Sequence, residues 1–266
     1  MSYLKQIVAL LLGEGLIHAA ISAENSTFYM AKPWQVTFQP AASPMMESIQ
    51  HMHSLLLIVI TGIASLVTLL LGYVLIRFCA KRNPIPSQTT HHVMLEIVWT
   101  LVPILILVVI GVPSVKLLFE LDQPQEADLT IKAIGRQWYW TYEYPNQDSK
   151  KSFSFDSTML DPKDLQAGQP RLLEVDKRLV VPVDTTVRIL VTSSDVLHSF
   201  AVPALGIKRD CVPGRINETW FRVHQPGIYY GQCSELCGVN HGFMPIAIHV
   251  VSKDQYEQWV KSHYSA

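Results

Sequence analysis

Two long apolar stretches constrain the fold of this chain more than any other feature. Residues 52–78 read MHSLLLIVITGIASLVTLLLGYVLIRF, and residues 93–119 read VMLEIVWTLVPILILVVIGVPSVKLLF. A helix needs about 20 mostly apolar residues to cross the hydrocarbon core of a bilayer, and both stretches exceed that length. A buried helical hairpin in a soluble protein is the alternative, but the low charge of both stretches favours the membrane. We therefore predict a transmembrane helical hairpin within residues 52–121.

The charges around the two stretches predict how the hairpin is oriented. The connecting loop carries Arg77, Lys81 and Arg82, whereas the residues at 120, 122, 126 and 128, after the second stretch, are acidic. Because lysine and arginine favour the cytoplasmic side, we expect the loop in the cytoplasm and both flanking segments outside.

The beginning of the sequence fits this orientation. Residues 1–23 contain one lysine, an apolar run and small residues near their end, which predicts a signal peptide. A signal peptide would deliver the following segment, residues 24–51, to the extracytoplasmic side. Glu14 interrupts the apolar run, so a short interfacial helix is the alternative for residues 1–23.

Residues 122–266 have the pattern of a separate β-rich domain. Short runs of strand-forming residues recur between Pro, Gly and Asp, as in sandwiches and barrels. The runs are LTIKAIG, QWYWTYEY, RLLEV, RLVVPV, TVRILVT, TWFRVH, GIYYGQC and PIAIHVV. A closing helix is expected at about residues 253–263. From residue 120 onward the chain has 18 acidic and 15 basic residues, so it offers no basic surface for nucleic acid.

The sequence GQCSELCGVNHGFMP, at residues 231–245, concentrates metal-binding side chains. It contains Cys233, Cys237, His241 and Met244, and His198 lies upstream at DVLHSF. Two cysteines and two histidines are the ligands of a structural zinc site, which is therefore one interpretation. The methionine thioether favours copper, because it is a weak axial ligand in copper electron-transfer sites. An early histidine followed by a Cys, His and Met loop is also the arrangement of blue-copper sandwiches.

The second cysteine is more than a mononuclear copper site needs. Such a site takes one cysteine, two histidines and one methionine. Two thiolates in one loop can instead bridge two copper ions, with His198 and His241 as one terminal ligand each and Met244 as an axial ligand. A backbone carbonyl could serve the second ion. Sharing both sulfurs spreads one electron over two metals, which suits electron transfer and leaves no open position for a substrate.

Seven sequence motifs together resemble subunit II of cytochrome c oxidase, the haem–copper respiratory oxidase, over essentially the whole chain. They are PWQVTFQPAASPMME, WTLVPILILVVIGVPS, GRQWYWTYEY, RLLEVDKRLVVPV, SDVLHSFAVPALGIK, PGRIN and GIYYGQCSELCGVNHGFMP. The resemblance implies a membrane-anchored α+β architecture, in which a two-helix transmembrane hairpin precedes a cupredoxin-like Greek-key β-sandwich at residues 122–266. It also implies a role: electrons from cytochrome c enter at a binuclear copper centre, CuA, and pass to haem in subunit I. There O2 is reduced to water and protons are pumped, so this chain would hold neither the haem nor the oxygen-reducing site.

The family's functional residues carry over to matching positions. The CuA ligands would be His198, Cys233, Cys237, His241, Met244 and the main-chain carbonyl of Glu235, whose side chain would help to hold a Mg²⁺ ion shared with subunit I. Trp138 would be the ring through which cytochrome c delivers its electron. An aromatic strand is more often core packing, and this alternative remains for QWYWTYEY. Cys79 and Cys211 are expected to be ordinary thiols.

Four acidic residues match family positions of lower specificity. Glu143, Asp156 and Asp195 would present carboxylates to cytochrome c, although scattered solvated acids are the alternative for each. Arg136 stands where the family commonly has histidine, which puts a positive charge beside the expected docking surface. Glu96 would lie at the mouth of a proton-uptake path, or would only cap its helix.

Rival interpretations share parts of this pattern. A quinol oxidase subunit II has the same architecture but lacks the copper ligands. A copper-delivery protein or a structural zinc protein would bind metal without being part of an enzyme. Nitrous oxide reductase also carries CuA, but in a longer chain. The complete ligand set and the two spans favour the oxidase subunit, with the lipid bilayer, subunit I and other oxidase subunits as partners. We expect a bacterial plasma membrane with the sandwich in the periplasm; the alternative is a mitochondrial inner membrane with the sandwich in the intermembrane space.

Overall fold

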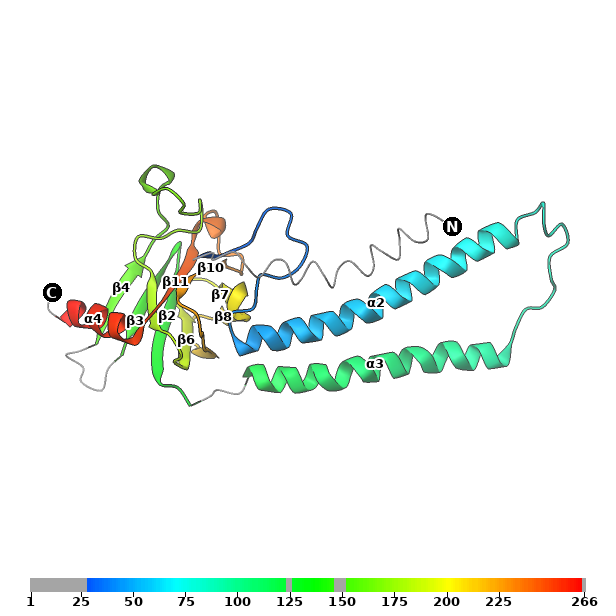
Figure 1. Cartoon of the computed structure of the whole chain (residues 1–266), viewed down its shortest axis with the longest axis horizontal. Coiled ribbons are helices and arrows are strands. Elements are labelled where there is room, and N and C mark those ends of the chain that lie inside the picture. Colours follow the sequence, from blue (N-terminus) through cyan, green and yellow to red (C-terminus); the bar gives the residue numbers. More distant parts are fainter. Residues whose placement is uncertain (1–27, 123–125, 146–151, 265–266) are drawn as a thin grey trace.

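The computed structural model describes residues 28–122, 126–145 and 152–264. A pair of long helices extends away from a β-rich domain, with the two helices side by side (Figure 1). The expected signal peptide at residues 1–23 lies outside the described residues. The expected fold class, a helical hairpin followed by a β-sandwich, is confirmed.

The two long helices are α2 (Pro44–Arg77) and α3 (Val93–Asp122). Both are long and apolar enough to cross a membrane, and no residue in the most apolar window of either helix is buried in the single chain. The first helix begins before the expected residue 52, because Ser43 caps it: its hydroxyl accepts a hydrogen bond from the Met46 backbone at 3.1 Å. Pro44 at the first helical position adds to the start signal, since its missing N–H is not needed there.

The β-rich domain consists of two packed sheets. Sheet A has the order β5-β11-β10-β7-β8, with β1 pairing alongside β10, and sheet B has the order β4-β3-β2-β6-β9. The strands are β1 (Phe28–Tyr29), β2 (Leu129–Arg136), β3 (Tyr139–Tyr144), β4 (Phe153–Ser157), β5 (Leu179–Pro182), β6 (Val187–Ser193), β7 (His198–Val202), β8 (Ile207–Cys211), β9 (Asn217–Phe221), β10 (Gly227–Cys233) and β11 (Pro245–Val251). The short 3₁₀ helices η2 (Pro162–Asp164), η3 (Pro203–Leu205) and η4 (His241–Phe243) connect strands, and α4 (Lys253–Tyr264) ends the described chain.

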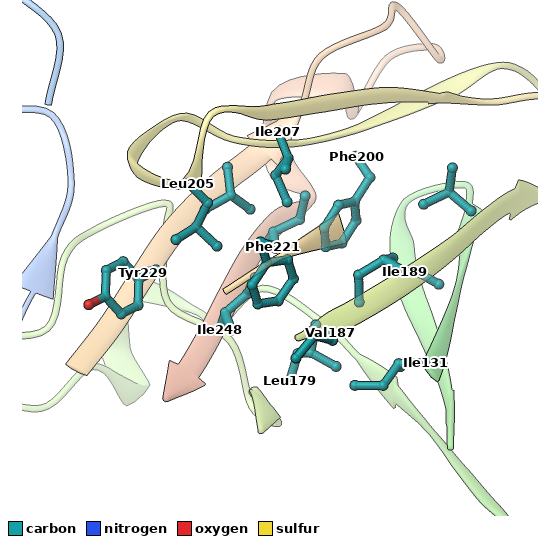
Figure 2. Packing of buried hydrophobic residues seen from close by; sticks show 14 of the residues in the cluster. Ile131, Leu179, Val187, Ile189, Phe200, Leu205, Ile207, Phe221, Tyr229 and Ile248 are labelled. Atoms are coloured by element: carbon teal, nitrogen blue, oxygen red, sulfur yellow. The ribbon is translucent and has the colours of Figure 1, made fainter. Parts of the chain in front are cut away.

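The core lies between the two sheets. Alternating residues of β6 point inward, which produces its strictly alternating burial. Figure 2 shows Val187 and Ile189 from this strand packed with Phe200, Phe221 and Ile248 from other strands. Because every second residue of a strand faces the same side, Val187, Ile189 and Val191 all face the core.

The turn between β7 and β8 joins the sandwich to the membrane helices. The buried Ser43 hydroxyl donates to the Leu205 carbonyl at 2.6 Å, and the Ala42 backbone donates to the Ala204 carbonyl at 2.9 Å. On β8, the Arg209 guanidinium donates to Asp122, the last residue of α3, at 2.6 Å. Both helices are therefore attached to the same β-hairpin of sheet A.

One expected strand is absent. The run RLLEV at residues 171–175 forms a turn, in which Leu172 has a φ of 68° and only Val175 makes an isolated bridge. The reason is an internal ion pair: the fully buried Glu174 carboxylate accepts two hydrogen bonds from Arg178, at 2.8 and 2.7 Å. Burial raises the pKa of Glu174, but hydrogen bonds from Arg178 and Tyr230 lower it more, so the net shift is downward.

Gly231 generates a prediction about the approach of β7 and β10. A Cβ atom at this position would lie 1.9 Å from the Ala201 carbonyl oxygen, so the two strands would have to separate. We expect Gly231→Ala to reduce the free energy of unfolding by about 3 kcal/mol, or the melting temperature by roughly 10 °C. Thermal unfolding of the detergent-solubilised chain by circular dichroism measures this. The control is Gly242→Ala, where no atom lies within 4 Å; equal melting temperatures for the two variants would contradict the prediction.

Candidate metal centre

The metal-binding side chains predicted from the sequence meet at one end of the sandwich. His198 begins β7, Cys233 ends β10, and Cys237 lies in the loop that follows. His241 is in η4, and Met244 immediately precedes β11. The pairing of Cys233 with Phe200 across β10 and β7 brings the loop over the start of β7. All except His241 are buried.

Donor atoms surround the Cys233 sulfur. Its Sγ lies 3.8 Å from His198 Nδ1, 3.9 Å from Cys237 Sγ and 3.4 Å from the Glu235 carbonyl oxygen. The backbone of Cys233 donates to the Met244 carbonyl at 3.2 Å and thereby closes the loop at its base. The Glu235 carbonyl thus reaches the site, while its half-buried side chain is on the loop surface.

The remaining two donors approach the Cys237 sulfur. Its Sγ lies 3.5 Å from His241 Nδ1 and 3.6 Å from Met244 Sδ. Donors bound to one metal at about 2.0–2.3 Å in a tetrahedron lie about 3.3–3.8 Å apart. The spacing around both sulfurs therefore fits metal ligation, and at 3.9 Å the two cysteines are not a disulfide, whose sulfurs would be about 2.05 Å apart.

The two thiols differ in acidity. Burial raises the pKa of Cys233, but hydrogen bonds with His198, His241 and the backbones of Glu235 and Ser199 together outweigh burial and lower the pKa to about 6. Burial raises the pKa of Cys237 to about 12, and the neighbouring charge of Cys233 adds to this effect. Without metal, the pair at neutral pH therefore holds one thiolate and one thiol. A cation bound between them would replace the remaining proton, because thiolates are the metal-binding form.

Asp195 fixes the orientation of the His198 ring. Its Oδ1 lies 2.8 Å from His198 Nε2, and its Oδ2 accepts from the Gln137 backbone at 2.7 Å. Burial raises the pKa of Asp195, but hydrogen bonds from His198 and the backbone outweigh it and lower the pKa, so the carboxylate stays ionised. With Nε2 held by Asp195, the Nδ1 of His198 faces Cys233, as in many metal-binding histidines that bond an outer carboxylate.

Sheet B supports the site from the other side. Gly135 lets the His198 ring approach β2, because a Cβ there would lie 2.8 Å from the ring. The buried Trp140 packs edge-on to His198, with 6.2 Å between ring centroids, and its Nε1 lies 3.4 Å from the Met244 carbonyl. Trp140 therefore belongs to the packing alternative for the aromatic strand.

Trp138 occupies a different position from Trp140. It lies in the turn between β2 and β3, half-buried, and its Nε1 donates to the Cys237 carbonyl at 3.2 Å. The Gln137 side chain donates to the same carbonyl at 2.8 Å. The indole is thus one hydrogen bond away from the backbone of a predicted metal ligand, at the protein surface.

The acidic residues expected to dock cytochrome c do not form one uniform group. Glu143 on β3 pairs with Lys132 at 3.1 Å, whereas Asp156 on β4 accepts a hydrogen bond from Thr141 at 2.6 Å. Arg136 also donates to Thr141, and to Ser194, so its charge lies close to Asp156. Asp195, on the loop between β6 and β7, lies next to the metal ligands.

Glu96 lies far from this site, in the first turn of α3. Its Oε1 accepts from the His92 backbone at 3.2 Å, while His92 Nδ1 accepts from the Leu95 backbone at 3.2 Å. These reciprocal bonds satisfy free N–H groups at the helix start. In the single chain, Glu96 therefore acts as a capping residue, and its expected place on a proton path stays a prediction.

Sequence reasoning missed the supporting residues around the ligands. The roles of Gln137, Trp140 and the Asp195 contact with His198 follow from strand placement, which the sequence does not show. One local signal was available: Asp195 and His198 are three residues apart in SDVLH, close enough for a carboxylate to meet the ring. Within the described residues, His198, Cys233 and Cys237 form the one group of three His, Cys, Asp or Glu side chains close enough to share a metal ion.

The fold and site define a membrane-anchored protein with a thiolate-rich metal site at one end of its β-sandwich. Two protein-family models match this chain. The model for the periplasmic domain of cytochrome c oxidase subunit II matches residues 129–251, and the model for its transmembrane domain matches residues 31–117.

Known relatives are similar in sequence to this chain over most of its length. A probable cytochrome c oxidase subunit 2 of Rickettsia prowazekii is 56% identical over 238 residues, which cover 89% of this chain and 75% of the relative. The subunit 2 of Oenothera berteroana is 50% identical over 235 residues, covering 87% of this chain and 91% of the relative. The chain belongs to the cytochrome c oxidase subunit II family, and the resemblance drawn from its motifs is confirmed.

A solved structure is also similar. The crystal structure of the periplasmic domain of cytochrome oxidase subunit II from Bradyrhizobium japonicum is 53% identical and covers 53% of this chain and 96% of its own, with a TM-score of 0.48. Membership of the haem–copper oxidase subunit II family implies copper, and the His198, Cys233 and Cys237 cluster suits it, because thiolate and imidazole are copper ligands.

The contact between Asp195 and His198 predicts an effect on metal affinity. Removing the carboxylate by Asp195→Ala frees the ring to rotate, so we expect copper affinity to fall about 10- to 100-fold. Competition with a chelator of known affinity, followed by optical absorption of the copper–thiolate bands, measures it. The control is Glu143→Ala, which removes an acid on β3 that is paired with Lys132 on the neighbouring β2. An unchanged affinity in Asp195→Ala would show that the ring is held by packing alone.

Proposed function

We propose that this chain is the electron-entry subunit of a cytochrome c oxidase, with two copper ions bound by the six donors predicted from the sequence. The observation that best supports this proposal is the position of the second thiol. Cys237 Sγ lies 3.9 Å from Cys233 Sγ, and each sulfur has its own histidine and its own weak donor close by. One ion would leave one histidine and one weak donor without a role.

The protein's contribution is a site that is already assembled. When bound, the copper centre accepts and releases single electrons. His198 is fixed by Asp195, and the loop from Cys233 to Met244 is closed by a backbone hydrogen bond between those two residues. Ligands held in place in this way need to move little when the charge of the site changes, which supports rapid electron transfer rather than binding and release of a substrate.

Trp138 is proposed as the entry point for the electron. Its indole reaches the surface and donates to the Cys237 carbonyl, so a hydrogen bond and a few covalent bonds join the ring to a ligand sulfur. Negative charge near this ring would attract a basic cytochrome c. We propose that Glu143, Asp156 and Asp195 supply this charge, with Lys132 offsetting part of the charge of Glu143 and Arg136 part of that of Asp156.

Other parts of the assignment rest on the family and on charge. We propose that the sandwich lies in the periplasm of a bacterium, that residues 1–23 are a signal peptide, and that residues 24–51, 52–121 and 122–266 are the outer segment, hairpin and copper domain. The Glu235 side chain would bind Mg²⁺ at the boundary with subunit I, which holds haem. The elongated helix pair supports a lipid-facing and subunit-facing role, because its apolar side chains are exposed in the single chain.

Copper stoichiometry tests the proposed centre. We expect two copper ions for each chain, and a loss of the shared centre in Cys233→Ser and Cys237→Ser, because a hydroxyl cannot replace a bridging thiolate. Elemental analysis with optical and electron paramagnetic resonance spectra measures both. The controls are Cys79→Ser, which changes an exposed thiol, and Cys211→Ser, which changes a buried thiol on β8. One copper per chain, preferential zinc binding, or bleaching by Cys211→Ser would contradict the assignment.

Electron entry is tested separately from metal binding. Trp138→Ala should keep both copper ions, because the ring is not a ligand, but should slow reduction by bound cytochrome c by at least about tenfold. Asp156→Asn should instead weaken association, and that loss should shrink as salt rises, since ions already screen the attraction in the parent. Stopped-flow reduction at several ionic strengths distinguishes the two. A Trp138→Ala variant with normal copper and a normal reduction rate would show that the ring only packs.

A further inference from the structure

The segment before α2 exposes large apolar side chains on the surface of the single chain. Residues 30–42, here called the N-terminal loop, read MAKPWQVTFQPAA and contain one charged residue, Lys32. Trp34 is 98% exposed and Val36 is 97% exposed, and the Phe38 ring between loop and helix is 44% exposed. Two large apolar residues with almost complete exposure, two positions apart, indicate a surface that another phase or molecule covers.

Contacts hold the N-terminal loop against α2. The Gln50 side chain donates to the Gln39 carbonyl at 2.8 Å, and the Phe38 ring meets the His53 ring edge-on at 4.7 Å between centroids. Figure 1 shows the dark-blue loop beside the first turns of α2, projecting along the helix pair from the sandwich. The loop is therefore fixed at the level of residues 50–53.

The position of residues 50–53 along α2 coincides with the edge of the bilayer. The 34 residues of α2 span about 51 Å, whereas the hydrocarbon core is about 30 Å thick, so about 14 residues lie outside it. The first turns are outside, because Met45 and Met46 are buried against the sandwich, and polar residues continue as far as Ser54. A predominantly apolar stretch without charged residues begins at Leu55, only two residues beyond His53, and continues to Ile76.

We propose that Trp34 and Val36 insert into the bilayer at the boundary between headgroups and acyl chains, in the leaflet on the sandwich side. Tryptophan favours this boundary, where its ring is apolar and its N–H can reach water or headgroups. The absence of acidic residues from the N-terminal loop, together with Lys32, fits a lipid surface. The loop would then form a second membrane contact beside the hairpin and help to set the height of the metal site above the bilayer.

Photo-crosslinking in the assembled oxidase tests the proposal. p-Benzoylphenylalanine is placed at Trp34 or at Val36, and the complex is reconstituted in nanodiscs of phosphatidylethanolamine and phosphatidylglycerol. Both positions are exposed, so neither change disturbs packing. The matched control is Lys163, whose side chain is 75% exposed on η2 of the sandwich. After irradiation, mass spectrometry of the chain identifies adducts by the added mass of one lipid or by a joined protein.

The expected result is a lipid adduct at positions 34 and 36 in about tenfold greater yield than at position 163. A crosslink from position 34 to another oxidase subunit would overturn the proposal and show that protein covers the N-terminal loop. The absence of any adduct at 34 and 36 would show that water surrounds these side chains, and would also overturn it. Equal lipid yields at all three positions would do the same, because they would reflect chance encounters.

Discussion

The short pairing between β7 and β10 is the contact on which the rest of the site depends. Only two residue pairs form it, with Cys233 opposite Phe200. It nevertheless places His198 Nδ1 3.8 Å from Cys233 Sγ, although the two residues are 35 positions apart in the sequence. The close approach is possible because Gly231 has no side chain. Two further backbone bonds, from Ser234 to Ser199 and from Cys233 to Met244, extend this pairing into the loop. These backbone hydrogen bonds attach both ends of the ligand loop to sheet A.

The same hairpin of sheet A connects the metal site to the membrane. His198 begins β7, and the turn after β7 receives the hydrogen bond from Ser43 at the start of α2. Arg209 on the returning strand β8 bonds Asp122 at the end of α3. Both helices are thus bonded to the hairpin that carries the predicted ligand His198. Electron transfer between subunits depends steeply on distance, so attaching the ligand strand directly to the membrane helices suits a subunit that passes electrons to a neighbour in the bilayer.

The sequence predicted those features that depend on local pattern. Helix hydropathy and the spacing of Cys233, Cys237, His241 and Met244 are local, and both led to the correct family. The start of α2 was placed too late because hydropathy identifies only the apolar span, whereas the helix begins at Pro44, where the Ser43 hydroxyl caps it. RLLEV was taken for a strand because its residues favour extended structure, whereas the buried Glu174 and Arg178 pair holds it in a turn. Likewise, no local pattern shows that Trp140 packs on His198 while Trp138 reaches the surface.

Asp195 has two proposed roles, docking cytochrome c and orienting the His198 ring. As a docking group it should face cytochrome c, but its oxygens accept hydrogen bonds from His198 and Gln137. Attraction between charges does not need a free lone pair, however; it needs a net charge near the surface, and 31% of the Asp195 side chain remains exposed. The hydrogen bonds that orient His198 also lower the pKa of Asp195 and keep it ionised, with burial acting in the opposite sense. One carboxylate can therefore hold a ligand ring and contribute to the surface field. Glu143 differs, because its carboxylate forms an ion pair with Lys132 at 3.1 Å.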